Sequence, residues 1–214
     1  MPPPNDALPH EALRWHIAQE ARQEIECQSY LHDASALLIT GLDAVVEVSR
    51  REQQMMVGRA DYFIIYRGFD MNRRPGRFAS VWEVKAPQCY VFDEDTQERL
   101  SPSIDLVHAE TQLMYYVAEM RGNQMLRERY AIRSDDDIQF GGVIIGCDER
   151  MVRRKARSPI TDEQMQRLVD EAMRLRTKTF YRPNQMRLLT WSALVEHLTP
   201  RDVAAINPVV QGME

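Results

Sequence analysis

The sequence predicts an α/β protein in which a mixed β-sheet is flanked by helices. Three observations predict this class. Two segments rich in β-branched and aromatic residues, 61–66 and 78–86, follow a shorter apolar run at 44–48, as in a meander of three strands. A continuous apolar run between glycines at 142–146 is typical of a strand buried on both faces. Helical segments alternate with the later strands, and this order favours helices on both faces of the sheet.

The expected helices have recognisable signals. Ser103 is a candidate N-cap, and Gly122 is placed to terminate the helix that follows it. Thr161 and Gln164 have the spacing of a capping box. In chain order, the predicted helices and the last strand occupy 11–32, 103–120, 161–176, 186–189 (the strand) and 192–198.

Length and composition indicate a soluble globular protein. The chain has 214 residues, 44% of them hydrophobic, which suits one domain over 1–214 with short tails at 1–8 and 201–214. The apolar fraction excludes a largely disordered chain, and no run approaches the roughly 18 apolar residues of a membrane span. The first residues lack the basic and apolar regions of a signal peptide, so we expect a cytoplasmic protein. The widely spaced cysteines suit neither a disulfide framework nor a zinc site.

Several basic residues cluster in two loops. The net charge of −5 argues against a surface that binds nucleic acid everywhere, but it does not exclude local clusters of arginine. The planar guanidinium fork suits phosphate, so these loops are candidates for contacts with a nucleic-acid backbone, and solvated loops are the alternative. The candidate residues are Arg73, Arg74, Arg77, Arg153, Arg154 and Lys155.

One strand carries charge where charge is costly. Glu83 and Lys85 alternate with apolar residues, so both side chains point to the same face of the strand. Asp61 opens another strong strand, and an adjacent antiparallel strand would bring its carboxylate beside Glu83. Two carboxylates this close repel each other, and a hard divalent cation relieves the repulsion. We therefore expect Asp61 and Glu83 to bind Mg²⁺ or Mn²⁺, with the Val84 carbonyl as a third ligand. Lys85 would orient the attacking water or stabilise charge growing at phosphorus.

The next helix and the first helix offer accessory groups. His108, Gln112 and Tyr116 follow one another at i, i+4 and i+8, so they share one side of a helix from which Gln112 could hold a ligand, water or phosphate. An amphipathic helix with these polar groups in solvent is the alternative. Glu24 in the first helix is a further candidate metal ligand, or a surface carboxylate.

This ordered set of residues resembles the PD-(D/E)xK nuclease superfamily, and more narrowly the catalytic domain of Shedu anti-phage defence proteins. The residues that carry the resemblance are Asp61, Glu83-Val84-Lys85 and Gln112-x-x-x-Tyr116. Similar stretches run in order over most of 20–198, at 24–38, 82–87, 109–112, 142–146 and 188–194. Ala60 and Cys147 depart from the pattern, which has Pro and Arg there. The resemblance implies a restriction-endonuclease-like fold, DNA cleavage dependent on Mg²⁺, and assembly into homo-oligomers.

The leading hypothesis is a metal-dependent DNA endonuclease, acting in anti-phage defence, in which water attacks a phosphodiester in line. Two alternatives stay open. One is a catalytically inactive nuclease-fold module that binds nucleic acid or assembles with a partner, and the other is a metal-dependent enzyme acting on RNA or another phosphodiester. The expected partners are DNA and further copies of the chain, and no small-molecule cofactor is inferred.

Overall fold

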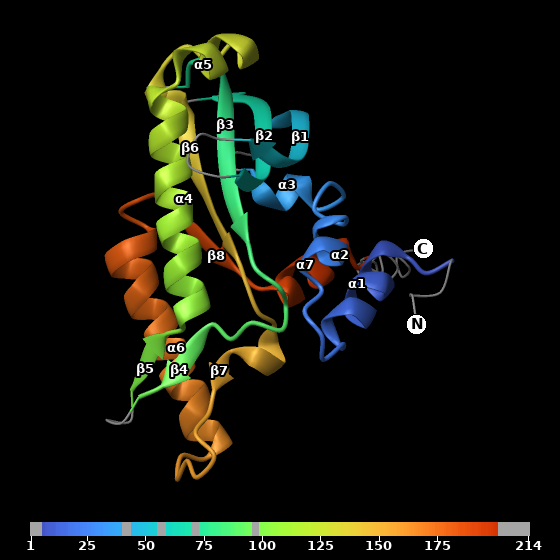
Figure 1. Cartoon of the computed structure of the whole chain (residues 1–214), viewed down its shortest axis with the longest axis vertical. Helices are drawn as coiled ribbons and strands as arrows, with labels where there is room; N and C mark the ends of the chain where they lie inside the picture. The colour runs from blue at the N-terminus through green and yellow to red at the C-terminus, as the bar shows by residue number, and fades with distance from the viewer. Residues whose placement is uncertain (1–5, 40–43, 55–58, 70–72, 96–98, 201–214) are drawn as a thin grey trace, which may run out of the picture.

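A five-stranded mixed sheet forms the centre of the protein (Figure 1). The structure, a computed structural model, describes residues 6–39, 44–54, 59–69, 73–95 and 99–200. The first three strands form an antiparallel meander, and the last three run parallel, in the order β1-β2-β3-β6-β8. The expected mixed sheet flanked by helices is confirmed. The strands are β1 Val45–Gln54, β2 Arg59–Phe69, β3 Pro75–Val84, β6 Ile138–Ile144 and β8 Arg187–Leu189.

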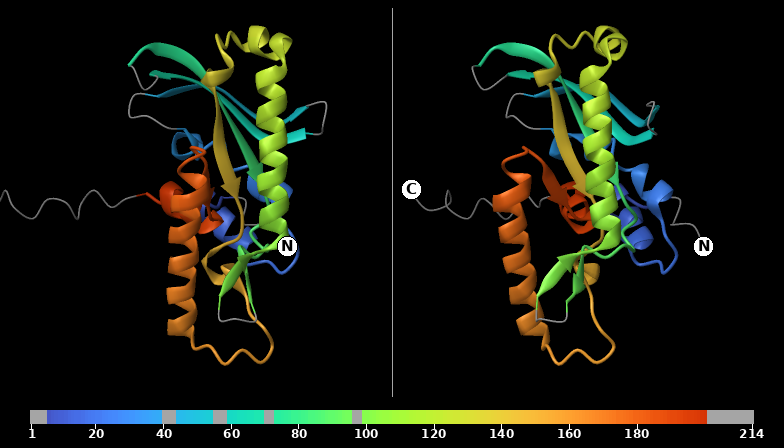
Figure 2. Two further views of the ribbon diagram at one scale, coloured as in Figure 1. Left: turned by 90° about the vertical axis from the view of Figure 1, so that its left-hand side faces the viewer. Right: turned by 60° about the vertical axis from the view of Figure 1, so that its left-hand side comes forward.

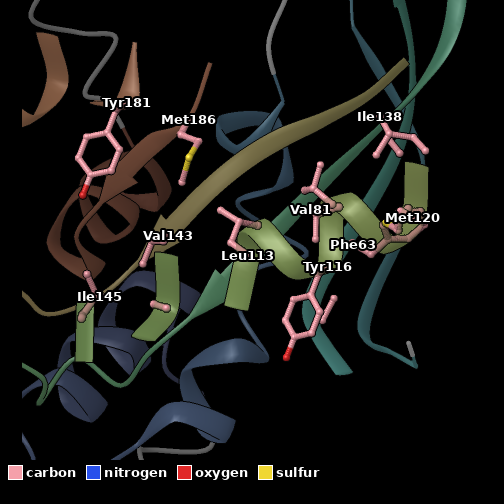
Figure 3. Close-up of a cluster of buried hydrophobic side chains, with 14 of the residues drawn as sticks. Phe63, Val81, Leu113, Tyr116, Met120, Ile138, Val143, Ile145, Tyr181 and Met186 are labelled. Atoms are coloured by element: carbon pink, nitrogen blue, oxygen red, sulfur yellow. The ribbon is translucent and has the colours of Figure 1, made fainter. Parts of the chain in front are cut away.

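The long helix α4, Ile104–Gly122, covers one face of the sheet (Figures 1 and 3). It begins as predicted, because the Ser103 side chain accepts a hydrogen bond from the Leu106 N–H at 3.1 Å. Leu113 and Tyr116 of α4 lie in the same buried cluster as Val81 and other apolar side chains of the strands (Figure 3). Burial of this inner face fixes α4 along the strands that carry the predicted site.

Four short helices cover the opposite face. Their buried side chains form a second apolar cluster with Trp82 and Val84 of β3. The Trp82 indole N–H donates to the Leu38 carbonyl at 3.1 Å, which ties the third helix to the sheet. These helices are α1 Pro9–Ile17, α2 Glu24–Gln28, α3 Ser35–Leu38 and α7 Trp191–Leu198.

A smaller sheet and a further helix lie at the end of the molecule where α4 begins (Figure 2). The small sheet has the order β5-β4-β7, and none of its strands is longer than three residues. The capping box predicted for α6 is confirmed by reciprocal hydrogen bonds between Thr161 and Gln164. The remaining elements are β4 Phe92–Glu94, β5 Leu100–Pro102, α5 Gln124–Tyr130, β7 Val152–Arg153, α6 Asp162–Arg176, the 3₁₀ turns Asp135–Asp137 and Asp148–Arg150, and the π turn Thr177–Tyr181.

The single helix predicted over 11–32 is wrong. The segment is divided between α1 and α2, with further turns before α3. The buried amide of Gln88 stabilises the break, because its Nε2 donates to the carbonyls of His16 at 3.0 Å and Gln19 at 3.1 Å. Its Oε1 accepts the Gln23 N–H at 3.0 Å. A side chain distant in sequence thus supplies the hydrogen bonds that a continuous helix would have made within itself.

Of the predicted tails, residues 1–5 and 201–214 lie outside the described residues. No helix among the described ranges combines the length and the apolarity that crossing a membrane requires.

Candidate active site

Asp61 and Glu83 meet where β2 begins and β3 ends. The antiparallel register pairs Tyr62 with Trp82, and one further step along each strand sets Asp61 opposite Glu83. The Asp61 Oδ2 accepts a hydrogen bond from the Val84 N–H at 2.9 Å, which holds this carboxylate against the end of β3. The expected convergence of the two acids is therefore present in the fold.

Glu83 is the most deeply buried acid of the site. It is 1% exposed, and its Oε1 accepts a hydrogen bond from Lys85 Nζ at 2.5 Å. Its Oε2 is also buried, and no hydrogen-bond partner for this atom lies among the residues that the structure describes. The pKa of Glu83 is raised to about 8: burial is the largest cause, the charge of Asp61 adds to it, and Lys85 opposes it. An ionised Glu83 therefore requires more positive charge than the fold itself supplies.

Lys85 is held by its backbone and by its side chain. Its N–H donates to the Ile144 carbonyl of β6 at 2.8 Å, and its carbonyl accepts the Trp191 indole N–H at 2.7 Å. Its Nζ also donates to Gln112 Oε1 of α4 at 2.9 Å. Burial acts to lower the pKa of Lys85, but the nearby carboxylates, Glu83 first among them, outweigh burial and raise it. The ammonium therefore stays charged at neutral pH beside the two acids.

Glu24 brings a third carboxylate to the site. It is the first residue of α2, and its Oε2 accepts the Ala86 N–H at 3.2 Å. Burial raises the pKa of Glu24, Lys85 lowers it, and Asp61 raises it. Gln88, which sequence reasoning missed, fixes the chain just before α2 and so helps to place Glu24. A lone Gln after a Pro gives no signal for such a role.

The donor set fits a hard cation that keeps several waters. Asp61 and Glu83 are oxygen donors, and the buried Glu83 Oε2 is a lone-pair site without a protein donor among the described residues. Mg²⁺ is commonly bound by one or two carboxylates, with water and substrate phosphate completing the shell. Within the described ranges, no group of three or more His, Cys, Asp or Glu side chains is arranged to enclose a metal. These residues therefore do not form a metal site that is enclosed entirely by protein side chains.

Tyr116 and His108, the other two predicted residues of α4, do not share the surroundings of Gln112. Tyr116 is 6% exposed and belongs to the apolar cluster beneath the helix (Figure 3). His108 is exposed on the outer side of α4. Gln112 thus reaches Lys85, whereas the Tyr116 ring contributes to the core.

The first arginine cluster lies at the opposite end of β3 from the site. Arg73 and Arg74 precede this strand, and its ten residues place them roughly 30 Å from Glu83. Both side chains are exposed. Arg77 donates to Glu47 Oε2 at 2.5 Å and to a backbone carbonyl, so its guanidinium is already engaged within the fold.

The second cluster is largely paired with acids. Arg153 forms a bidentate ion pair with Asp93, with both N···O distances at 2.8 Å. Arg154 contacts Asp162 at 2.5 Å, while Lys155 is exposed. A phosphate contact by Arg153 or Arg154 would have to compete with these carboxylates. Binding of nucleic acid by either cluster stays a prediction.

Comparison of the chain with known protein families gave no match, and comparison with curated proteins gave none either.

Proposed function

We propose that this chain is a metal-dependent phosphodiester hydrolase that cuts DNA, with Mg²⁺ or Mn²⁺ as its cofactor. One observation carries the proposal: a buried glutamate, one of whose oxygens has no hydrogen-bond donor among the described residues, lies beside a second carboxylate and a fixed ammonium. A site built only for stability gains little from such an arrangement, because burying unbalanced charge is costly.

Each group has a role in this chemistry. Asp61 and Glu83 would hold the cation, with the Val84 carbonyl as a further donor. When bound, the cation would supply a water of lowered pKa and polarise a phosphoryl oxygen. Lys85 would orient the attacking water or stabilise the charge that grows at phosphorus, and Gln112 holds the Lys85 ammonium in position.

DNA as the substrate, a role in anti-phage defence and assembly into homo-oligomers rest on the resemblance to Shedu nucleases. The exposed Arg73, Arg74 and Lys155 are candidates for backbone contacts beyond the site.

A nuclease assay with a matched lysine control tests the proposal. Wild type and Lys85→Ala are incubated with single- and double-stranded DNA and with RNA, in Mg²⁺, Mn²⁺ or chelator. Lys178→Ala removes an exposed lysine of the π turn and serves as the control. We expect metal-dependent DNA cleavage by wild type and the control, and a loss of about 10²-fold or more in Lys85→Ala. Inert wild-type protein across the whole panel, or an unimpaired Lys85→Ala, would refute the proposal.

A second candidate function is a catalytically inactive nuclease-fold module that binds nucleic acid. The direct 2.5 Å contact between Lys85 and Glu83 favours it, because an ion pair of this kind partly neutralises the glutamate without a cation. Such a module would bind DNA in a salt-sensitive way that neither Asp61→Ala nor chelator changes, and it would not cut.

A further inference from the structure

The outward face of α4 carries no charge along its whole length. A helix on the surface of a soluble protein normally presents charged and polar residues to water, as α6 does with Asp162, Glu163 and Asp170. On α4, seven exposed residues form one continuous uncharged strip, here called the α4 outer stripe. Its members are Ile104, Val107, Thr111, Met114, Tyr115, Ala118 and Gly122.

Covering this stripe would remove apolar surface from water at little polar cost. Ile104 is 55% exposed and Tyr115 is 63% exposed, so a large part of each side chain is available for contact. The Thr111 hydroxyl already donates to the Val107 carbonyl at 2.8 Å. It would therefore not lose a hydrogen bond if the stripe were buried.

We propose that the α4 outer stripe is a contact surface between two copies of this chain, whose α4 helices pair in antiparallel orientation. In a symmetric antiparallel pair, a residue that precedes the middle of one helix meets the residue that follows the middle of the partner helix by the same number of positions. With the two-fold axis near the middle of α4, bulky residues face small ones. Ile104 meets Gly122, Val107 comes next to Ala118, and Tyr115 meets Thr111.

Two polar side chains at one edge of the stripe support the same register. His108 and Glu119 lie on the same side of α4, eleven residues apart and centred on its middle. In the antiparallel pair, His108 of each copy faces Glu119 of the other, and this contact occurs twice. A parallel pair would instead set His108 against His108 and Glu119 against Glu119. Opposed helix dipoles favour the antiparallel arrangement as well.

The size of the α4 outer stripe determines how tightly we expect the two copies to associate. α4 has 19 residues and is about 28 Å long, so a single helix pair covers less than the roughly 800 Å² per partner of a standard interface. We therefore expect a reversible dimer that forms as the protein concentration rises. If the proposed nuclease function holds, the two sites open on the same side of this dimer, because Gln112 lies at the same edge of α4 as His108.

Sedimentation velocity on the full chain, from about 1 to 200 μM, tests the surface without any need for nuclease activity. We expect wild type to shift from monomer to dimer over this range. Tyr115→Glu and Ala118→Arg should each weaken the dimer by about tenfold or more. Val45→Lys changes an equally exposed apolar residue on β1, away from α4, and should leave the dimer unchanged. Wild type that stays monomeric at every concentration would overturn the proposal, as would equal dimerisation by all three variants.

Disulfide trapping tests the register. A Cβ at Gly122 would meet nothing within 4 Å, so Gly122→Cys should fold normally, and the native cysteines are all buried. Under mild oxidation, Ile104→Cys combined with Gly122→Cys should give a covalent dimer. Neither single variant should, because in the antiparallel pair the two copies of one position lie about 27 Å apart. Efficient crosslinking of Ile104→Cys alone would indicate a parallel pair and overturn the proposed arrangement.

Discussion

Replacing the buried acid with its neutral isostere, Glu83→Gln, should make the folded protein less sensitive to pH. The pKa of Glu83 is about 8 in the folded chain, against 4.5 for an ordinary glutamate. An acid whose folded pKa is raised destabilises the fold progressively as the pH rises from its unfolded pKa to its folded pKa. Below pH 4.5 there is no penalty, and at pH 7 the penalty reaches about 3 kcal/mol.

The net gain in Glu83→Gln will be smaller than that penalty. Lys85 loses the partner that it contacts at 2.5 Å, and this loss offsets part of the gain. We expect the variant to be more stable than wild type by about 1 to 2 kcal/mol at pH 7. The difference should grow from pH 5 to pH 8.

Urea unfolding without added metal, followed by circular dichroism at several pH values, measures this difference. Glu163→Gln, which removes an exposed acid of α6, is the control and should track wild type. A difference between Glu83→Gln and wild type that does not change with pH, or a variant that is less stable than wild type at pH 8, would refute the reasoning.

Three further substitutions probe how the site is supported. Gln88→Ala should lower the free energy of unfolding by about 1 to 3 kcal/mol, because it leaves buried backbone groups without partners. Urea unfolding measures this loss, and an unchanged free energy of unfolding would contradict the role assigned to Gln88. Arg176→Met should destabilise by about 3 kcal/mol, because it leaves the 4% exposed Glu110 without its cation, and a double variant that also neutralises Glu110 should recover part of the loss. Gly142→Ala should unfold at a clearly lower temperature than wild type, because φ of Gly142 is +152° and the added Cβ would lie 2.0 Å from the Arg187 carbonyl oxygen. A melting curve like that of wild type would show that β6 can shift at this position.

The convergence of the acids could be predicted because it follows from local pattern. Alternation along a strand sets Glu83 and Lys85 on one face, and the aromatic and β-branched content of 61–66 identifies the neighbouring strand. The cap at Ser103 and the capping box at Thr161 are also local, and both are present as expected.

Features that depend on distant partners could not be predicted in this way. The break between α1 and α2 depends on Gln88, roughly 70 residues further along the chain. The strands of the small sheet are too short for an alternation of apolar and polar residues to be recognised in the sequence. Clustering of arginines in the sequence favours loops that contact phosphate or stay solvated, whereas Arg77 and Arg153 are paired with acids 30 and 60 residues away.

Binding of a hard cation by Asp61 and Glu83 is measured most directly by calorimetric titration of Mn²⁺ into the metal-free protein. We expect one ion per chain in wild type, with an affinity that rises by up to roughly tenfold per pH unit below pH 8, because Glu83 must lose its proton. Asp61→Asn should lose this binding, while Asp93→Asn, which alters an acid paired with Arg153, should retain it. Wild type that binds no ion, or Asp61→Asn that binds with unchanged affinity, would contradict the proposed metal site.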